Sequence, residues 1–240
     1  MALVGQTEPS EIRAPLTRER VLQTAIALAD EHGLEAFSMR KLADELGVAA
    51  MSLYHHVPNK DQWLDAMIDL VFSEIELPST DDEWKTAMRK RAVSTLEALN
   101  RHRWAVGLME GRGTHGPANL RLHDAVLGCL RGAGFSLEMT VHAYSVQDAY
   151  IYGFALQQAD MTPETSEDFA ATAEQQMETY KDVLADYPHL VEVVGGHVAT
   201  AGYDYETEFL FGLDLILAGL DQLREVSPPL GSKLPGLAPS

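Results

Sequence analysis

Apolar residues recur at helical spacing in the first sixty positions and predict three short helices. The first helix lies between Thr17 and Gly33, which are suitable starting and stopping residues. A second helix runs from Ser38 to Gly47, and a third covers about residues 50–56. The inner stripe of the first helix is Leu22, Ala25, Ile26 and Ala29. Together they predict a small N-terminal helical domain.

The remaining chain also follows a helical pattern. An unbroken apolar stripe predicts a long helix from Asn59 to about Ile75, and Pro78 ends it. Joints containing glycine or proline separate the further predicted helices, at about 81–101, 104–110, 118–132, 137–159, 166–186 and 204–225. No segment has the pattern of a strand. The expected fold class is all-α, with a three-helix N-terminal domain followed by a larger helical bundle.

Proline content and polarity set the limits of these domains. Residues 1–15 are polar, show no periodicity and are expected to form a flexible arm. The N-terminal domain then covers 16–62 and the bundle covers 63–226. Residues 227–240 are rich in proline and glycine and are expected to be disordered.

The formal charge of −18 is distributed unevenly. Up to Gln62, six Lys/Arg against nine Asp/Glu leave −3, whereas twelve against twenty-seven from Trp63 onward leave −15. The N-terminal domain can therefore present a local basic surface to phosphate, while the bundle disfavours anionic small molecules.

The single cysteine, Cys129, excludes an intrachain disulfide and a cysteine-based metal cluster. No apolar run reaches the roughly 20 residues of a membrane span, and the first residues lack the features of a signal peptide. We therefore expect a soluble, cytoplasmic protein without a membrane partner. No cofactor and no metal site are expected.

The second and third predicted helices, joined at Gly47, match a helix-turn-helix. In this motif a tight turn sets the crossing angle, and one helix carries short or polar side chains toward base edges. Ser38, Tyr54 and Lys60 are donors near helix ends, where phosphate contacts usually lie. Arg40 is the side chain best equipped to bind a guanine. The sequence thus predicts double-stranded DNA as a partner.

Two segments make this motif more specific. The region Leu16–Leu64 resembles the TetR family of bacterial transcriptional repressors. The resemblance is carried by the segment LTRERVLQTAIALADEHGLEAFSMRKLADELGV and by the segment SLYHHVPNK that follows it. A second region, Gly134–Gln158, is more weakly similar to the effector domain of the tetracycline repressors. Its sequence is GFSLEMTVHAYSVQDAYIYGFALQQ. The resemblance implies an all-helical homodimer that stays on a palindromic operator until a small molecule releases it.

The resemblance also implies roles for single residues. Base edges would be read by Arg40, Ser52 and His55, with Met51 and the alanines packing on bases, and phosphates would be held by Tyr54, His56 and Lys60. The complete set expected to contact DNA is Thr17, Ser38, Arg40, Ala50, Met51, Ser52, Tyr54, His55, His56 and Lys60. Ala50 replaces a base-reading amide of the tetracycline repressors and His55 replaces a tryptophan. The operator sequence therefore cannot be carried over.

A second copy of the chain is expected, because one recognition helix gives too little specificity for a genome. The segment FLFGLDLILAGLDQL, Phe209–Leu223, is apolar on more than one face and must be buried on both sides. With the 137–159 helix it can form a four-helix interface, and its alternative role is the central helix of a monomeric bundle. The expected interface residues are Ala149, Tyr152, Leu156, Phe209, Leu213, Ile216, Leu217 and Leu220.

Polar and aromatic residues scattered through the apolar helices of the bundle suggest a small-molecule site. The residues expected to bind the effector are Trp104, Met109, His123, Tyr144, Gln147, Asp148, Ile151 and Phe154. Such a site suits an effector that is hydrophobic and not strongly anionic. The local motif around the metal-binding histidine of the tetracycline repressors is absent from RWAVGLMEGRG, so His115 or His123 as a metal ligand lacks support.

Two other classes of protein compete with a regulator. An enzyme is disfavoured, because the chain has no nucleophile elbow, phosphate loop, HExxH pair or closely spaced carboxylate motif. A helical adaptor without sequence-specific DNA binding is the remaining alternative. The sequence predicts a ligand-responsive regulator, most simply a repressor.

Overall fold

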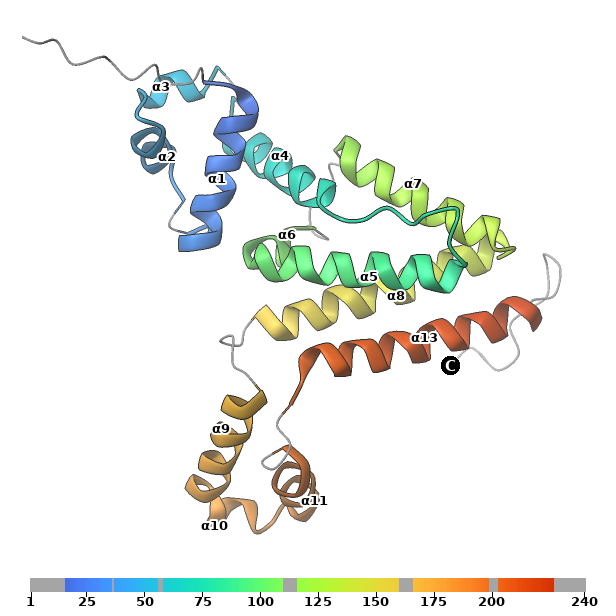
Figure 1. Cartoon of the computed structure of the whole chain (residues 1–240). Helices are drawn as coiled ribbons and strands as arrows, with labels where there is room; N and C mark the ends of the chain where they lie inside the picture. The colour runs from blue at the N-terminus through green and yellow to red at the C-terminus, as the bar shows by residue number, and fades with distance from the viewer. Residues whose placement is uncertain are drawn as a thin grey trace, which may run out of the picture. The chain divides into compact units, whose positions relative to one another are not determined.

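The computed structural model describes residues 16–35, 37–55, 58–109, 116–159, 166–198 and 203–226, and all regular structure in them is helical (Figure 1). The predicted all-α class is therefore confirmed. The chain divides into two compact units, Met1–Met67 and Ile68–Ser240. This division falls inside one helix, α4 (Lys60–Ser73), five residues later than the boundary expected from the sequence. The predicted arm and tail, 1–15 and 227–240, lie outside the described residues.

The first unit contains α1 (Arg18–His32), α2 (Met39–Leu46), α3 (Ala50–Leu53) and the start of α4. Side-chain oxygens cap three of these helices at their first turn. Thr17 accepts from the Arg20 amide at 3.2 Å, Ser38 from the Lys41 amide at 3.2 Å, and Asn59 from the Gln62 amide at 2.9 Å. The sequence thus defines the starts of α1, α2 and α4 locally, whereas α3 begins after Ala49 without a side-chain cap.

The helix-turn-helix depends on the conformation of Gly47. Its φ of 64° and ψ of 39° are left-handed, and its amide donates to the carbonyls of Ala43 and Asp44. Beyond this turn, α3 makes a single helical turn and ends at Leu53, whereas the sequence predicted a helix to about residue 56. The expected inner positions are buried, among them Leu22, Ala25, Ile26, Leu42, Leu46 and Leu53.

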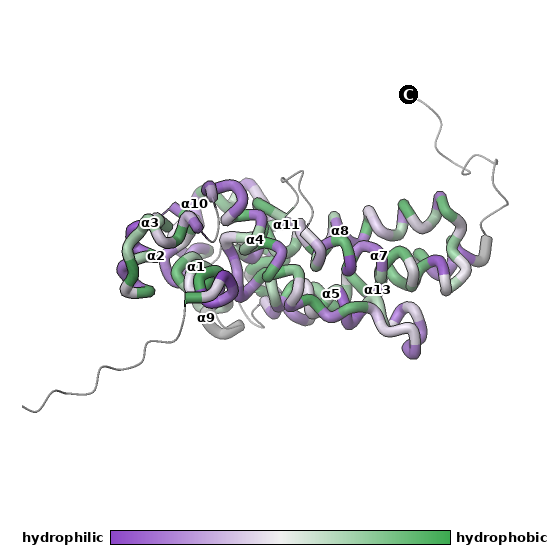
Figure 2. Tube along the Cα trace, turned by 90° about the horizontal axis from the view of Figure 1, so that it is seen from above, coloured by the Kyte–Doolittle hydropathy of each residue, from purple (hydrophilic) through white to green (hydrophobic). Residues whose placement is uncertain are grey.

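The second unit is a helical bundle. Its main elements are α5 (Trp84–Arg101), η1 (Arg103–Ala105), α6 (Val106–Met109), α7 (Pro117–Gly132), α8 (Leu137–Ala159) and α13 (Tyr205–Val226). Helices α5, α8 and α13 lie side by side, and α7 packs on both α5 and α8 (Figure 1). Hydrophobic and hydrophilic residues are interspersed along the helices of this unit (Figure 2).

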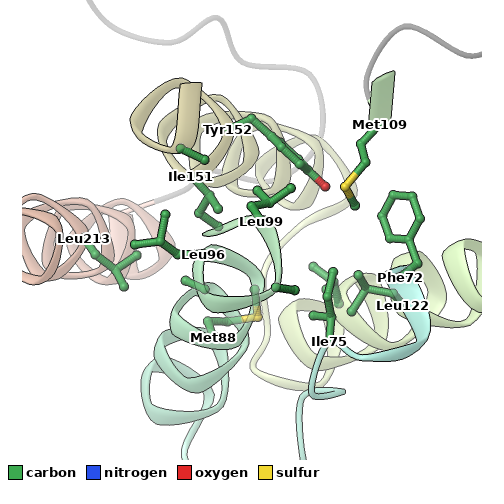
Figure 3. Close-up of a cluster of buried hydrophobic side chains, with 14 of the residues drawn as sticks. Phe72, Ile75, Met88, Leu96, Leu99, Met109, Leu122, Ile151, Tyr152 and Leu213 are labelled. Atoms are coloured by element: carbon green, nitrogen blue, oxygen red, sulfur yellow. The ribbon is translucent and has the colours of Figure 1, made fainter. Parts of the chain in front are cut away.

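The core of this bundle draws side chains from every main helix (Figure 3). Trp84 packs edge-on against Phe135 with ring centroids 4.9 Å apart, and the Arg224 guanidinium lies over both rings. The Tyr150 hydroxyl donates to the Phe209 carbonyl at 3.0 Å, which ties α8 to α13. Contacts of aromatic side chains therefore join α5, α8 and α13.

One further region differs from the prediction. The helix expected over 166–186 is divided into α9 (Ser166–Thr179) and α10 (Lys181–Leu184), and α11 (Pro188–Val193) follows. The interruption lies at Tyr180, whose φ of −106° and ψ of 15° are not helical. Val194–Val198 was expected to be a glycine-rich joint, but it continues α11 as a π-helical turn, η2. None of the helices in the described ranges is both long and apolar enough to cross a membrane.

Candidate functional site

The turn and the two helices around it expose most of the residues expected to contact DNA. Arg40, Tyr54, His55 and Lys60 are exposed, and so is Met51, with 73% of its surface accessible. Thr17 and Ser38 are also exposed, and Ala50 and Ser52 are half-buried. His56 lies outside the described residues. An exposed methionine beside polar and cationic side chains is suited to a nucleic-acid groove, in which bases offer apolar edges as well as polar ones.

The hydroxyl groups on this surface are already partly engaged. The oxygens of Thr17 and Ser38 accept backbone N–H groups, which leaves each hydroxyl hydrogen able to donate to a phosphate. The Ser52 hydroxyl instead donates to the Ala49 carbonyl at 2.5 Å. Ser52 can therefore only accept from a partner, such as the amino group of a base.

A cavity of about 370 Å³ lies in the second unit, within the size range of small-molecule sites. Its apolar wall consists of Phe72, Met109, Ala149 and Tyr152. Its polar wall consists of Asn119, His123, Tyr144, Ser145 and Asp148. The walls come from α4, α6, α7 and α8, and Figure 3 shows Phe72, Met109 and Tyr152 gathered on one side of the core.

The polar wall contains a chain of hydrogen bonds. His123 Nδ1 lies 3.0 Å from the backbone carbonyl of Asn119, and the Tyr144 hydroxyl lies 2.5 Å from His123 Nε2. Because a carbonyl only accepts, a neutral His123 carries its hydrogen on Nδ1 and accepts the Tyr144 hydroxyl at Nε2. Burial, and secondarily the charge of Asp148, raise the pKa of Tyr144 above its usual value.

A buried ion pair supports this wall. Arg91 Nη2 on α5 donates to Asp148 Oδ1 on α8 at 2.6 Å, and the Arg91 side chain is only 2% exposed. Among the described residues, Asp148 is the one carboxylate that lines the cavity, and Arg91 neutralises it. This part of the wall is therefore polar without presenting an uncompensated charge.

The N-terminus of α7 is fixed by a carboxylate from α4. Asp69 Oδ1 accepts the backbone amides of Ala118 at 2.9 Å and Asn119 at 3.1 Å, as expected for an acidic group at the positive end of a helix. Gly116 lies so close that an added Cβ would overlap the Asp69 carboxyl group. This contact sets the position of Asn119 in the cavity wall.

Four of the expected effector-binding residues do not line this cavity. Ile151 is fully buried in the core, and Gln147 is buried with its amide donating to the Ala143 carbonyl at 3.0 Å. Phe154 packs edge-on against Phe209, and Trp104 lies beside His102. Helical spacing places Gln147 and Ile151 on one face with Tyr144 and Asp148, but both are buried in the core and do not line the cavity.

The expected interface residues are divided in a similar way. Ala149 and Leu156 are exposed and Ile216 is half-buried, whereas the others lie in the core of a single protomer: Tyr152, Phe209, Leu213, Leu217 and Leu220. Ala149 and Tyr152 also line the cavity. The opposite face of α13 carries the exposed apolar side chains Phe211 and Leu215. A helix that is apolar on two faces does not itself reveal which face packs within the protomer.

Five cavity residues were not expected to bind the effector. Ala149 and Tyr152 were expected at the dimer interface, and the other three are Phe72, Asn119 and Ser145. The role of Asn119 in the cavity wall could have been predicted. Asn119 lies one helical turn before His123, and it is a polar residue at an inner position of α7 where an apolar residue is expected. Phe72 belongs to the apolar stripe of α4 and gave no separate signal. No group of metal-ligating side chains that could hold an ion occurs within the described ranges.

Comparison with known proteins gives matches along nearly the whole chain. Residues 21–67 match the model described as bacterial regulatory proteins, tetR family, and residues 77–224 match the tetracyclin repressor-like C-terminal domain. The transcriptional repressor DrrR1 of Streptomyces coeruleorubidus is 35% identical over 87% of this chain and 78% of its own. The class C tetracycline repressor protein of Escherichia coli is 30% identical over 87% and 92%.

A solved structure agrees with these sequence matches. ActR of Streptomyces coelicolor, a TetR family protein in complex with actinorhodin, is 30% identical with a TM-score of 0.70. The alignment covers 87% of this chain and 98% of that one. Members of the matched family are regulators, which confirms the expectation that the chain is not an enzyme. The chain therefore belongs to the TetR family of bacterial regulatory proteins, as a ligand-responsive transcriptional repressor with a tetracycline repressor-like C-terminal domain.

Proposed function

We propose that the protein binds a palindromic operator as a homodimer and leaves it when a neutral or weakly charged small molecule enters the cavity. The observation that carries this proposal is the exposed face around Gly47, whose left-handed turn joins α2 and α3. Arg40 lies in α2, Met51 lies in α3, and Tyr54 directly follows α3. A helix-turn-helix with this face fits the major groove.

On this surface Arg40 reads a base, whereas Lys60 holds a phosphate. Arg40→Ala is expected to cost about 1–3 kcal/mol of discrimination between operator and random duplex. Lys60→Ala weakens binding to both duplexes alike and reduces the slope of affinity against salt. The measurement is fluorescence anisotropy with genomic fragments first selected by the wild-type protein, each paired with a scrambled duplex. Equal losses on both duplexes for Arg40→Ala would remove this residue from the base-reading set.

The homodimer is proposed to form through the exposed apolar side chains of α8 and α13. Phe211 and Leu215 lie one turn apart on α13 and are 65% and 60% exposed, and Val141 and Leu156 on α8 are also exposed. Large apolar side chains left exposed on two neighbouring helices are candidates for a protein interface.

The oligomeric state of a double variant tests this interface. Phe211→Asp with Leu215→Asp should give a monomer in light scattering at micromolar concentration, because each interface would bury unpaired carboxylates. Leu120→Asp, at a similarly exposed leucine on α7, is the matched control and should remain dimeric. A dimeric double variant would refute this choice of face.

Coupling between effector and DNA is proposed to pass through α4. This helix begins at the proposed phosphate contact Lys60 and contributes Phe72 to the cavity. Its residue Asp69 binds the N-terminus of α7. A ligand that prefers a shifted α7 would therefore also bias α4, which is the differential affinity that regulation needs. The similarity to ActR, which was solved in complex with actinorhodin, supports a small-molecule effector for this chain.

The coupling is tested with Asp69→Ala. This variant should bind the operator and still bind a releasing compound, but the compound should release less DNA at saturation. Releasing compounds are found by screening aromatic molecules for loss of operator anisotropy. Unchanged release by Asp69→Ala would exclude this route.

A further inference from the structure

We propose that α3 selects T·A base pairs in the operator, with the Met51 side chain in contact with the C5-methyl group of thymine. This inference rests on the proposed binding of the helix-turn-helix in the major groove and adds which base pair α3 prefers. It follows from the side chains of residues 49–53, which offer apolar contacts and one hydrogen-bond acceptor but no free donor.

The hydrogen-bonding capacity of α3 comes from a single side chain. Ser52 is the only polar residue in this helix. Its hydroxyl group donates to the backbone carbonyl of Ala49, and 2.5 Å separate the two oxygens. Ser52 Oγ can therefore accept a hydrogen bond, but it has no hydrogen left for a base. Guanine presents only acceptors in the major groove, so no side chain of α3 is able to recognise it.

Met51 supplies the apolar contact. Its side chain is 73% exposed, whereas Leu53 is fully buried and anchors α3 in the first unit. The neighbours of Met51 are small, since Ala49 is exposed and Ala50 is half-buried. Small neighbours let the backbone approach a base edge closely, and the unbranched thioether can adapt its shape to an apolar group there. The exposed surface of α3 is thus suited to a methyl group.

The base pairs differ in what they offer to this surface. Thymine carries a methyl group in the major groove, and the adenine paired with it carries an amino group that donates. A T·A pair therefore offers a partner to Met51 and a partner to Ser52. A C·G pair offers only the amino group. The guanidinium of Arg40, which can donate to guanine, belongs to α2, so the two helices are suited to different base pairs.

Replacement of thymine by uracil tests the proposal, because it removes the C5-methyl group and leaves base pairing unchanged. Duplexes selected by the wild-type protein are prepared with deoxyuridine at one thymine at a time, and fluorescence anisotropy gives their affinities at fixed salt. At one or more thymines the wild type should bind the uracil duplex about fourfold more weakly, which corresponds to one apolar carbon group left in water. Equal affinity at every thymine overturns the proposal.

Variants identify the side chain that contacts the methyl group. Met51→Ala should bind the thymine and uracil duplexes within about 1.5-fold of each other, whereas Met51→Leu should retain most of the wild-type ratio. Because Met51 is exposed, both variants should keep the thermal melt of the wild type. A fourfold ratio that persists in Met51→Ala overturns the role of Met51.

Lys60→Ala is the matched control on the same surface. Lys60 is a proposed phosphate contact, so its removal should weaken binding to both duplexes and leave their fourfold ratio unchanged. A ratio that is lost in Lys60→Ala as well would overturn the assignment to Met51, because the loss would then follow from weaker binding in general.

The selection step separates this inference from the proposed function. A protein that selects no particular fragments contradicts the proposed function and the inference with it. A protein that selects fragments without a shared T·A pair, or that binds thymine and uracil duplexes alike, contradicts only the preference of α3.

Discussion

The buried pair Arg91–Asp148 makes a sharp test of how the bundle is stabilised. Asp148→Leu would leave the Arg91 guanidinium without its carboxylate at a site only 2% exposed. Removing one partner of a buried pair costs about 3–5 kcal/mol, because the remaining charge is uncompensated. Two nitrogens of Arg91, Nε and Nη1, already lack a hydrogen-bond partner, so the loss should lie in the upper part of that range.

The reverse change should cost less. Arg91→Leu leaves Asp148 charged, but this carboxylate lines a cavity of about 370 Å³ that is large enough to admit water. We expect a loss of about 1–3 kcal/mol for this variant. The double variant replaces both charges by apolar groups and should lie within about 2 kcal/mol of the wild type. The coupling energy of the cycle is then at least about 2 kcal/mol.

Urea unfolding at 25 °C and fixed protein concentration gives the four free energies, with fluorescence of Trp84 and Trp104 reporting on the second unit. The exposed pair Arg89–Asp214 has a similar distance, 2.9 Å, and provides the control cycle. Its coupling should be about 1 kcal/mol or less, since water screens both groups. Additive losses in the buried cycle, or equal coupling in the two cycles, would refute the argument from burial.

Three further changes have expected outcomes that follow from local geometry. Gly116→Ala should lower the free energy of unfolding in urea by about 1–3 kcal/mol, because the added Cβ would displace Asp69. Gly128→Ala, in the open middle of α7, is the control and should raise the free energy of unfolding by up to about 1 kcal/mol. Gly47→Ala should cost about 1–2 kcal/mol and lower operator affinity, since φ is 64° there; an unchanged thermal melt would contradict this. Because burial raises the pKa of Tyr144, its stabilising contribution is present below about pH 10 and lost at higher pH, so wild type should lose stability relative to Tyr144→Phe between pH 9 and 11. A constant difference between these two proteins across that interval would exclude the expected effect.

Local sequence signals were sufficient for the elements of the first unit. Caps such as Thr17 and Ser38 define helix starts through bonds within three residues, and Gly47 supplies a turn that few other residues adopt. These interactions are short in sequence, so they can be recognised without the fold. The short length of α3 is the exception, because a single helical turn has little periodicity to measure.

In the second unit, local sequence signals predicted the helices but not which of their residues line the cavity. The helix over 137–159 has the bounds predicted from its apolar pattern, yet its residues could not be assigned to core, cavity or outer surface. Ile151 and Asp148 share a face, but only Asp148 reaches the cavity, because the positions of α5 and α7 decide what is left open. On α13, two apolar faces compete, and only the packing against α5 and α8 selects the one that carries Leu213 and Leu217.

The bond between Asp69 and the start of α7 separates two tasks within this regulator. In the proposed mechanism, side chains that face the cavity decide the identity of the compound, whereas the link to α4 uses backbone amides that almost any residue would supply. Variation at Met109 or Tyr144 can therefore change the inducer without altering the mechanical joint. A biosensor library that randomises the walls but retains Asp69 and Gly116 should yield new specificities that still switch transcription.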